Sequence, residues 1–213
     1  MKEKQEAHLN GAGSQLSVQF AREIEDSVGV TTKLLDEAAE LIAQMAIMVA
    51  TRLRAGHKLI IFGNGGSAAH AQHIATEFVG RYLAEREALP AIALTTDTSA
   101  LTAIGNDYGF EHVFSRQIRA LGNRGDVALG ISTSGESQNV LCGLAVAREL
   151  GLGTLGFTGR NGGKVRNLAD LCLCVPSSST PRVQEAHILV GHILTGMVEN
   201  VLLSEKSLNS MVT

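Results

Sequence analysis

Apolar residues recur at helical intervals over residues 24–49, in the N-terminal part of the chain. They are Ile24, Val28, Leu34, Leu35, Leu41, Ile42, Met45, Met48 and Val49. Spacings of three and four residues predict one or two helices, which end near Arg54 because Gly56 interrupts the pattern. Residues 1–17 are mostly polar, so we expect a flexible tail there and a single domain over residues 18–213.

Beyond Gly56 the pattern changes to short apolar runs rich in branched residues. The runs are LIIFG from Leu59, AIALTT from Ala91, VALGIST from Val127, TLGFTG from Thr154 and LCLCV from Leu171. Stretches with helical periodicity or loop composition separate them. This alternation predicts an α/β fold, a doubly wound parallel sheet of about five strands flanked by helices. A last apolar pattern predicts a helix from Pro181 to Leu203, capped by Thr180.

Composition narrows the classes of function. The chain has 213 residues, 45% of them hydrophobic, which suits one α/β domain with a core. A net charge of −3 argues against a nucleic-acid partner bound through a broad basic face. We find no apolar run near the roughly 18–20 residues of a membrane span, and the polar N-terminus has no signal core. We therefore expect a cytoplasmic protein without a membrane partner.

The chain has three cysteines, and they form no CxxC pair. They are Cys142, Cys172 and Cys174. The last two are two residues apart, so on a strand they point to the same side. Because a free cysteine packs as a small hydrophobe, we interpret these residues as plain buried thiols rather than metal ligands.

Two predicted strands end in short loops rich in glycine and hydroxyl residues. GNGGS at residues 63–67 follows the first strand, and STSGES at residues 132–137 follows the third. Ligands bind where parallel strands end, and the free N–H groups of a helix N-terminus favour a phosphate. Neither loop has a dinucleotide or P-loop motif. One such loop is equally consistent with an ordinary strand-to-helix turn, but two in one chain favour a phosphate ester as the ligand.

Five segments together carry a family resemblance. GNGGS, QHIATEFVGRY, LTAIGNDYG, GISTSGES and RVQEAHILVGH occur in this order over about residues 20–203. In combination they resemble the bacterial phosphoheptose isomerases, which are SIS-domain (sugar isomerase) proteins. The resemblance implies a homotetramer that converts sedoheptulose 7-phosphate to D-glycero-D-manno-heptose 7-phosphate. This aldose–ketose isomerisation is the first step of heptose biosynthesis, for lipopolysaccharide core or related glycans.

The reaction moves a proton between adjacent carbons through an enediol. It needs a base and a second group that acts on the substrate oxygens. The resemblance assigns Glu77 as the base and His192 as its acid/base partner. Spacing independently places His73 and Glu77 on one helical face. The resemblance also implies one zinc ion per chain, held by His73, Glu77, Gln184 and His192, where it would act as a Lewis acid. A zinc-bound carboxylate is a poorer base, and the sequence leaves open whether Glu77 has both roles.

The same resemblance implies the residues that contact the substrate. The phosphate would lie on Ser132, Thr133, Ser134 and Ser137, and the sugar on Asn64, Gly65, Gly66, Ser67, Glu77, Asn106, Asp107 and Gln184. Single residues are open to simpler interpretations. His73 alone fits a structural helix histidine, Asp107 alone fits a turn residue, and Arg81 fits a surface partner of Glu77. Only the combination of these residues, in this order along the chain, favours a functional site.

Two further histidines fall outside this assignment. His70 stands where the family usually has an acidic residue, and it shares a helical face with His73 and Glu77. It is open to interpretation as an extra ligand, an altered proton relay or a change in substrate. His187 is five residues before His192, so the two cannot share a face of a helix. We expect His187 to be structural or to lie at a subunit contact.

Two alternative functions stay open at this point. One is an SIS isomerase that acts on another ketose phosphate, such as an arabinose or hexulose phosphate. The other is a catalytically silent SIS protein that binds the bacterial replication initiator. Such relatives lack the paired His73 and Glu77 and the second histidine, which this chain has.

Overall fold

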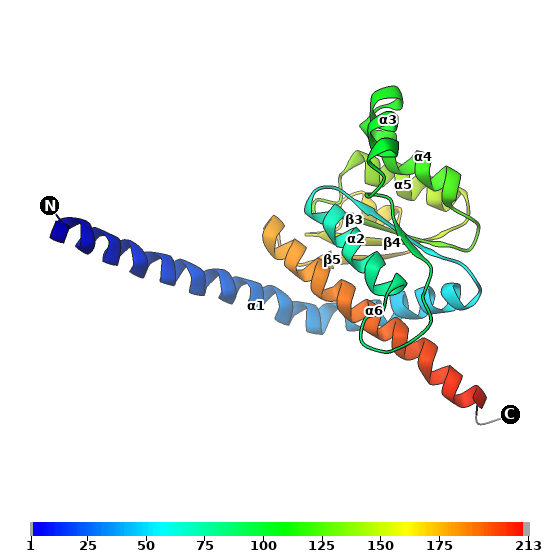
Figure 1. Ribbon diagram of the computed structural model, residues 1–213, viewed down its shortest axis with the longest axis horizontal. Coiled ribbons are helices and arrows are strands. Elements are labelled where there is room, and N and C mark those ends of the chain that lie inside the picture. The colour runs from blue at the N-terminus through cyan, green and yellow to red at the C-terminus, as the bar shows by residue number, and fades with distance from the viewer. Residues whose placement is uncertain (1, 211–213) are drawn as a thin grey trace.

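The computed structural model describes residues 2–210, with side chains over residues 15–204 (Figure 1). Five strands alternate with helices. The elements are α1 (Lys2–Arg54), β1 (Leu59–Gly63), α2 (Gly66–Val79), β2 (Ala91–Ala93), α3 (Thr98–Tyr108), the 3-10 turn η1 (Phe110–His112), α4 (Val113–Leu121), β3 (Val127–Ser132), α5 (Gln138–Glu149), β4 (Gly153–Gly159), the 3-10 turn η2 (Val165–Asn167), β5 (Leu171–Val175) and α6 (Thr180–Ser210). The predicted α/β fold is confirmed.

All five strands are parallel and form one sheet in the order β2-β1-β3-β4-β5. The chain moves from β1 outward to β2, then returns to the other side of β1 and continues outward through β3, β4 and β5. The strand order therefore reverses between β1 and β3. In open parallel sheets this switch point leaves a crevice at the carboxyl ends of the strands, where ligands bind. The GNGGS loop follows β1 and the STSGES loop follows β3, so both border this crevice.

Helices cover both faces of the sheet, which explains why the strands read as continuous apolar runs. One core lies between the sheet and α1, α2 and α6, and includes Leu59, Ile61, Leu129, Phe157 and Leu173. The other lies between the sheet and α4 and α5, and includes Ile60, Phe62, Phe114, Ile118 and Leu144. Neighbouring residues of β1 alternate between the two cores, as strand geometry requires.

The N-terminal helix differs from the expected tail. α1 begins at Lys2 and continues to Arg54 without a break at residue 17, and Figure 1 shows its first half projecting away from the sheet. A single helix therefore accounts for the apolar pattern up to Arg54. The division of the chain into a tail and a domain over residues 18–213 stays a prediction.

Helix α6 corrects the expectation that no apolar run approaches the length of a membrane span. Residues Thr180–Ser204 are long enough and contain an 18-residue window with a mean hydropathy of 1.4, which satisfies that criterion. Core helices of soluble proteins satisfy it as well, and α6 buries Val190, Leu194 and Val198 in the core. The cysteines also differ from the expected buried thiols: Cys142 on α5 and Cys172 and Cys174 on β5 are each only partly buried.

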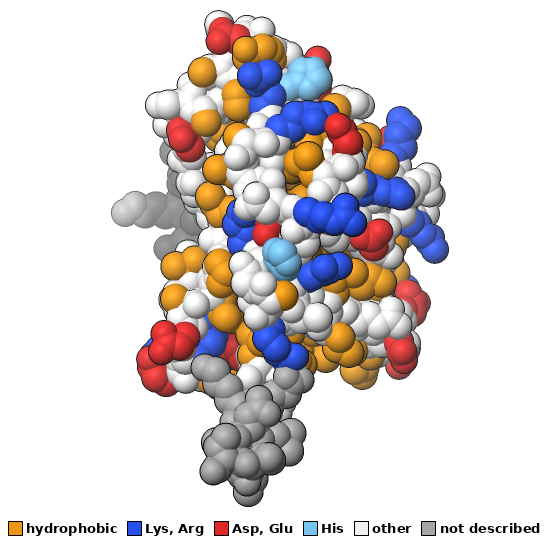
Figure 2. Space-filling model, turned by 90° about the vertical axis from the view of Figure 1, so that its right-hand side faces the viewer, with side chains coloured by type: hydrophobic (Ala, Val, Ile, Leu, Met, Phe, Trp, Pro, Cys, Tyr) orange, Lys and Arg blue, Asp and Glu red, His pale blue; other side chains and the backbone are white. Residues whose placement is uncertain are grey.

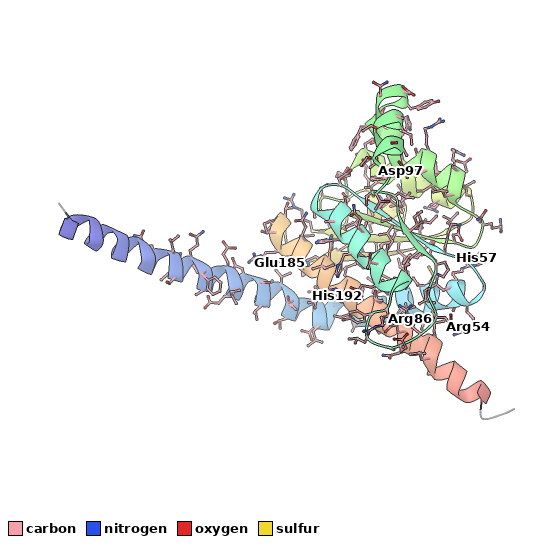
Figure 3. All side chains as sticks on the ribbon, in the orientation of Figure 1. Arg54, His57, Arg86, Asp97, Glu185 and His192 are labelled. Carbon is pink, nitrogen blue, oxygen red and sulfur yellow. The ribbon has the colours of Figure 1, made fainter. Side chains whose placement is uncertain are left out.

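Figure 2 shows the right-hand side of Figure 1, the side on which Figure 3 labels His57. Basic side chains extend across the middle of this face, interspersed with acidic and apolar ones.

The carboxylate of Asp126 accepts hydrogen bonds from the Lys58 ammonium at 2.6 Å and the Asn123 backbone N–H at 2.8 Å. Burial alone would raise the pKa of Asp126, but these donors outweigh it and lower that pKa. The carboxylate ties together the loops that precede β1 and β3.

A buried ion pair anchors the loop that follows α2 to α6. Arg86 Nε lies 2.8 Å from Glu199 Oε1, and the two side chains are 4% and 2% exposed. Glu199 also accepts hydrogen bonds from the backbone N–H groups of Tyr82, Leu83 and Ala84. Burial would raise the pKa of Glu199, but the three N–H donors and Arg86 outweigh it and lower that pKa.

We predict that Glu199→Gln destabilises the fold by about 3–5 kcal/mol, because it leaves the Arg86 charge buried without a counter-charge. Urea unfolding at neutral pH measures the loss. The difference from wild type should shrink as the pH falls below about 4.3, since a carboxylate with a lowered pKa loses its contribution as it becomes protonated.

The matched control is Glu149→Gln. Glu149 pairs with Arg119 at 2.7 Å, but these side chains are 59% and 52% exposed. Because solvent screens this exposed pair, the loss of Glu149 should destabilise the fold much less than the loss of Glu199. Equal losses for the two variants would contradict the assigned role of Glu199.

Candidate active site

Helices α2 and α6 lie side by side in a close and regular register. At the start of α2, a Cβ on Gly66 would lie 2.4 Å from Gln184 Nε2. Two turns later, a Cβ on Gly191 would lie 2.7 Å from Ile74 Cδ1. A Cβ at either position would require the end of the Gln184 or the Ile74 side chain to move, so glycine permits this close contact between the helices. This register places residues near 73 on α2 opposite residues near 192 on α6.

Three predicted residues meet across this contact. Nε2 of His73 lies 2.7 Å from Nε2 of His192, and 3.3 Å from Oε1 of Glu77. One ligand atom from each residue lies within 4.8 Å of the other two. The i, i+4 spacing within α2 places His73 beside Glu77, and the register with α6 adds His192. Figure 3 shows His192 in the middle of α6.

This cluster has the chemistry of a metal site. Two imidazoles and one carboxylate are ordinary ligands for Zn²⁺, whose bonds to them are about 2.0–2.2 Å long. Two such ligands at a tetrahedral angle would lie about 3.3 Å apart, which matches the separation of His73 and Glu77. The two imidazole nitrogens are closer than this, so they would need to separate slightly. The residues therefore fit a divalent metal.

The fourth implied ligand, Gln184, lies at the start of α6. Its amide packs against Gly66, at the N-terminal end of α2. Gln184 thus borders both the GNGGS loop and the groove between the helices. No hydrogen bond joins its side chain to His73, Glu77 or His192 within the described part of the chain, so its role as a ligand stays a prediction.

Two neighbours of the cluster were not predicted from the sequence. The Tyr82 ring stacks on His192, with ring centroids 5.5 Å apart and an interplanar angle of 14°. The guanidinium of Arg86 donates a hydrogen bond of 2.7 Å to the backbone carbonyl of Glu77. Arg81, expected as a surface partner of Glu77, instead pairs with Glu85 at 3.7 Å. The stretch from Tyr82 to Arg86 has no periodicity, so no sequence pattern signals these contacts.

His70 lies on α2, between Gly66 and Ile74. His187 lies on α6, between Gln184 and Gly191, so the two histidines are in register with each other. His187 is fully buried, and its Nε2–H donates to the Thr158 carbonyl at 3.0 Å. Burial lowers the pKa of His187 to about 4. The pKa of His70 is also lowered, first by burial and then by the nearby His73. Both imidazoles are therefore neutral at pH 7. His187 is structural within this chain, as expected, and does not face His192.

The hydroxyls of the STSGES loop gather at the end of β3. Ser132 Oγ lies 2.9 Å from Ser137 Oγ and 3.5 Å from Ser134 Oγ, while the backbone N–H of Glu136 donates to Ser134 Oγ. Thr133 belongs to the same turn, and its carbonyl accepts a hydrogen bond from the Gly159 N–H of β4. The loop therefore presents converging hydroxyls at the carboxyl edge of the sheet, which suits a phosphate.

An amide pair joins the two loops. The side chains of Asn64 and Asn139 exchange two hydrogen bonds, each of 2.8 Å. Asn139 lies in the first turn of α5 and was not predicted as a site residue. A cavity of about 640 Å³ adjoins the pair, within the usual size of ligand pockets. Its lining comprises Asn64, Phe110, Glu111, His112, Ser137, Gln138, Asn139 and Cys142.

The remaining predicted substrate contacts lie in different places. Gly65 adopts a φ of +54° in the GNGGS loop, a conformation that favours glycine. Ser67 is buried in the first turn of α2. Asn106 and Asp107 lie on α3, are exposed, and hydrogen-bond to each other at 2.8 Å. No hydrogen bond joins Asn106 or Asp107 to another predicted site residue in the described chain.

Comparison with known proteins identifies the family. The model of the SIS domain matches residues 19–159. The phosphoheptose isomerase of Roseiflexus sp. (strain RS-1) is 54% identical over 183 residues, which are 86% of this chain and 93% of that protein. The phosphoheptose isomerase of Aquifex aeolicus is 55% identical over 177 residues, which are 83% of this chain and 93% of that protein.

A solved structure agrees with the sequence comparison. The phosphoheptose isomerase of Neisseria gonorrhoeae superposes with a TM-score of 0.83 at 44% identity, covering 87% of this chain and 99% of that one. This chain therefore belongs to the phosphoheptose isomerase family of SIS-domain proteins.

Proposed function

We propose that this protein interconverts sedoheptulose 7-phosphate and D-glycero-D-manno-heptose 7-phosphate through an enediol. The observation that carries the proposal is that the chain has both the cluster of His73, Glu77 and His192 and a loop of converging hydroxyls. Proton-handling groups and a phosphate-binding loop are what an aldose–ketose isomerisation of a phosphosugar requires. Family membership names the sugar. A catalytically silent protein would not need this cluster.

We assign the base to Glu77. Its carboxylate would remove the proton from the substrate carbon beside the carbonyl, and would return it to the neighbouring carbon. His192 would move the proton between the two substrate oxygens. The stacked Tyr82 ring restrains the His192 imidazole, and the hydrogen bond from Arg86 to the Glu77 carbonyl fixes the end of α2. Positioning of this kind keeps the reacting groups within hydrogen-bond reach.

We assign the phosphate to the hydroxyls of Ser132, Thr133, Ser134 and Ser137 and to the free N–H groups at the start of α5. The sugar would extend from there toward Glu77 past Asn64, Gly65, Gly66 and Ser67. Asn106, Asp107 and Gln184 complete the proposed set.

We propose one zinc ion per chain, held by His73, Glu77, Gln184 and His192. When bound, it would act as a Lewis acid toward the substrate oxygens. The fit of the two imidazoles and the carboxylate supports the site. The choice of zinc as the metal and the role of Gln184 as a ligand both belong to the proposal.

We also propose a cytoplasmic homotetramer. Apolar side chains on α1 and α6 stay exposed in the single chain, including Phe20 at 69%, Leu35 at 73% and Ile193 at 47%. A cavity of about 560 Å³ lies between these helices and is lined mostly by apolar residues from Val28 to Met197. Exposed apolar surface of this kind is typical of subunit contacts. The tetramer would support heptose synthesis for envelope glycans.

Glu77→Gln keeps the shape of the side chain but removes the proton acceptor, so turnover should fall by about 10²–10⁴-fold. In deuterated water the wild type should exchange the hydrogen beside the substrate carbonyl, and Glu77→Gln should not. NMR follows both processes. A variant that turns over and exchanges like wild type would show that Glu77 is not the base. Ser134→Ala is the contrasting control, since losing one phosphate contact should mainly raise KM.

Removal of the metal tests the proposed cofactor. Protein purified without chelator should contain about one divalent metal per chain by elemental analysis, and the stripped protein should lose activity. Adding Zn²⁺ back should restore it. Full activity in verified metal-free protein would remove zinc from the proposal without affecting the isomerase assignment.

Light scattering tests the assembly. At micromolar concentration the mass should be four times the 22.5 kDa of one chain. Replacing the exposed Leu35 by Glu should shift the distribution toward smaller species, because it buries a charge in the proposed contact. A wild-type mass of one chain would overturn the tetramer.

A further inference from the structure

An acidic residue interrupts the hydroxyl loop that is proposed to hold the phosphate. Glu136 lies between Gly135 and Ser137, and its backbone N–H donates to Ser134 Oγ at 3.2 Å. Its carboxyl is ionised at neutral pH, because a hydrogen bond from Lys164 lowers the pKa of Glu136. A phosphate also carries negative charge, so this carboxylate would repel it. Phosphate binding therefore depends on where the carboxylate of Glu136 is held.

The start of α5 gives the position of this carboxylate a second importance. Ser137 is the N-cap residue of α5, and its hydroxyl pairs with Ser132 Oγ at 2.9 Å. The first N–H groups of a helix have no acceptor within the helix, so they attract anions. These are the groups to which the phosphate is assigned. Glu136 directly precedes the N-cap residue, so its carboxylate would compete with the phosphate for them if it were free to turn.

The loop between β4 and β5 holds the carboxylate instead. Glu136 Oε1 accepts a hydrogen bond from the Lys164 backbone N–H at 3.1 Å, and Oε2 lies 3.0 Å from the Lys164 ammonium. One residue of the neighbouring loop thus engages both carboxylate oxygens. The side chains of Lys164 and Glu136 are 70% and 47% exposed. A pair this exposed contributes little to stability, so its effect has to be sought in the charge that it controls.

Glycine contacts fix the spacing of the two loops. A Cβ on Gly135 would lie 2.1 Å from the Gly162 carbonyl oxygen. A Cβ on Gly163 would lie 2.8 Å from the Gly135 carbonyl oxygen and 2.9 Å from Glu136 Oε1. The two backbones are therefore in direct contact, and Lys164 follows Gly163 at this point of contact. Because the loops are already packed together, the short reach from Lys164 to Glu136 is set by the backbone.

We propose that Lys164 is a positioning residue for phosphate binding, an inference that rests on the proposed function. By holding both oxygens of Glu136 against its own loop, Lys164 keeps this carboxylate from repelling the phosphate and from occupying the N–H groups at the start of α5. Lys164 acts through Glu136 and needs no contact with the substrate. Loss of Lys164 should therefore weaken phosphate binding only while Glu136 is present, which distinguishes this role from direct binding by Lys164.

The experiment is a double-mutant cycle in the full-length protein, read by the KM for sedoheptulose 7-phosphate and the Kd for inorganic phosphate. Lys164→Met should raise both constants about 3–10-fold, as charges several ångströms apart in a solvated site predict. A smaller change in kcat is expected, since phosphate binding is shared by substrate and transition state. Glu136→Gln should change both constants little when Lys164 is present, but should restore them in the Lys164→Met background. Lys164→Arg, which keeps the charge, should rescue binding.

Ionic strength separates an effect of charge from an effect of packing. Salt screens exposed charges, so the effect of Lys164→Met on both constants should shrink between about 0.05 and 0.5 M NaCl. A packing defect would persist. The matched control is Arg119→Met, which breaks the exposed pair with Glu149 at the far end of α5 from the hydroxyl loop. This control should leave both constants unchanged at either salt concentration.

Unchanged constants in Lys164→Met, or an increase that salt does not reduce, would overturn the proposal. An equal factor for Glu136→Gln with and without Lys164 would also overturn it, because the two charges would then act independently. Inactivity of the wild type toward sedoheptulose 7-phosphate would count against the proposed function instead. The Kd for inorganic phosphate does not depend on activity, so the expected order of the variants in that measurement would still support the role of Lys164.

Discussion

The close contact of α2 with α6 is the constraint on which the rest of the site depends. Gly66 and Gly191 leave room for the Gln184 and Ile74 side chains of the facing helix. His73 and Glu77 come from one helix and His192 from the other, and they meet only because the helix axes approach this closely. The buried pair of Arg86 and Glu199 then ties the end of α2 to α6 about two turns beyond His192. Packing glycines at one end and a satisfied ion pair at the other thus hold the register.

The reversal of strand order between β1 and β3 complements this helix contact. It brings two loops that are distant in sequence to the same edge of the sheet, and the Asn64–Asn139 amide pair joins them. His73 and Glu77 of the proposed proton-handling cluster lie on α2, the helix that leaves the first loop, and His192 lies on α6. The hydroxyl cluster lies in the second loop. One reversal of strand order therefore brings the two glycine loops to the same edge of the sheet, as the proposed binding of one phosphosugar requires.

Much of the fold could be predicted from the sequence, because buried parallel strands are continuous apolar runs with distinct ends. The order of the strands could not be read from those runs. The i, i+4 pair of His73 and Glu77 was also accessible, since helix geometry fixes it locally. The partnership with His192 came from family resemblance, because a contact between helices 119 residues apart leaves no local pattern. For the same reason, no sequence pattern indicates Tyr82 or Asn139 as a site residue.

The register between α2 and α6 also bears on how this family can change in length. Deleting one residue from an α-helix rotates everything beyond it by about 100°. A deletion between Gly66 and Glu77, or between Gln184 and Glu199, would turn one half of the site away from the other. Insertions and deletions in descendants of this chain should therefore be confined to the loops and to the outer end of α1, while these two helical stretches keep a constant number of residues.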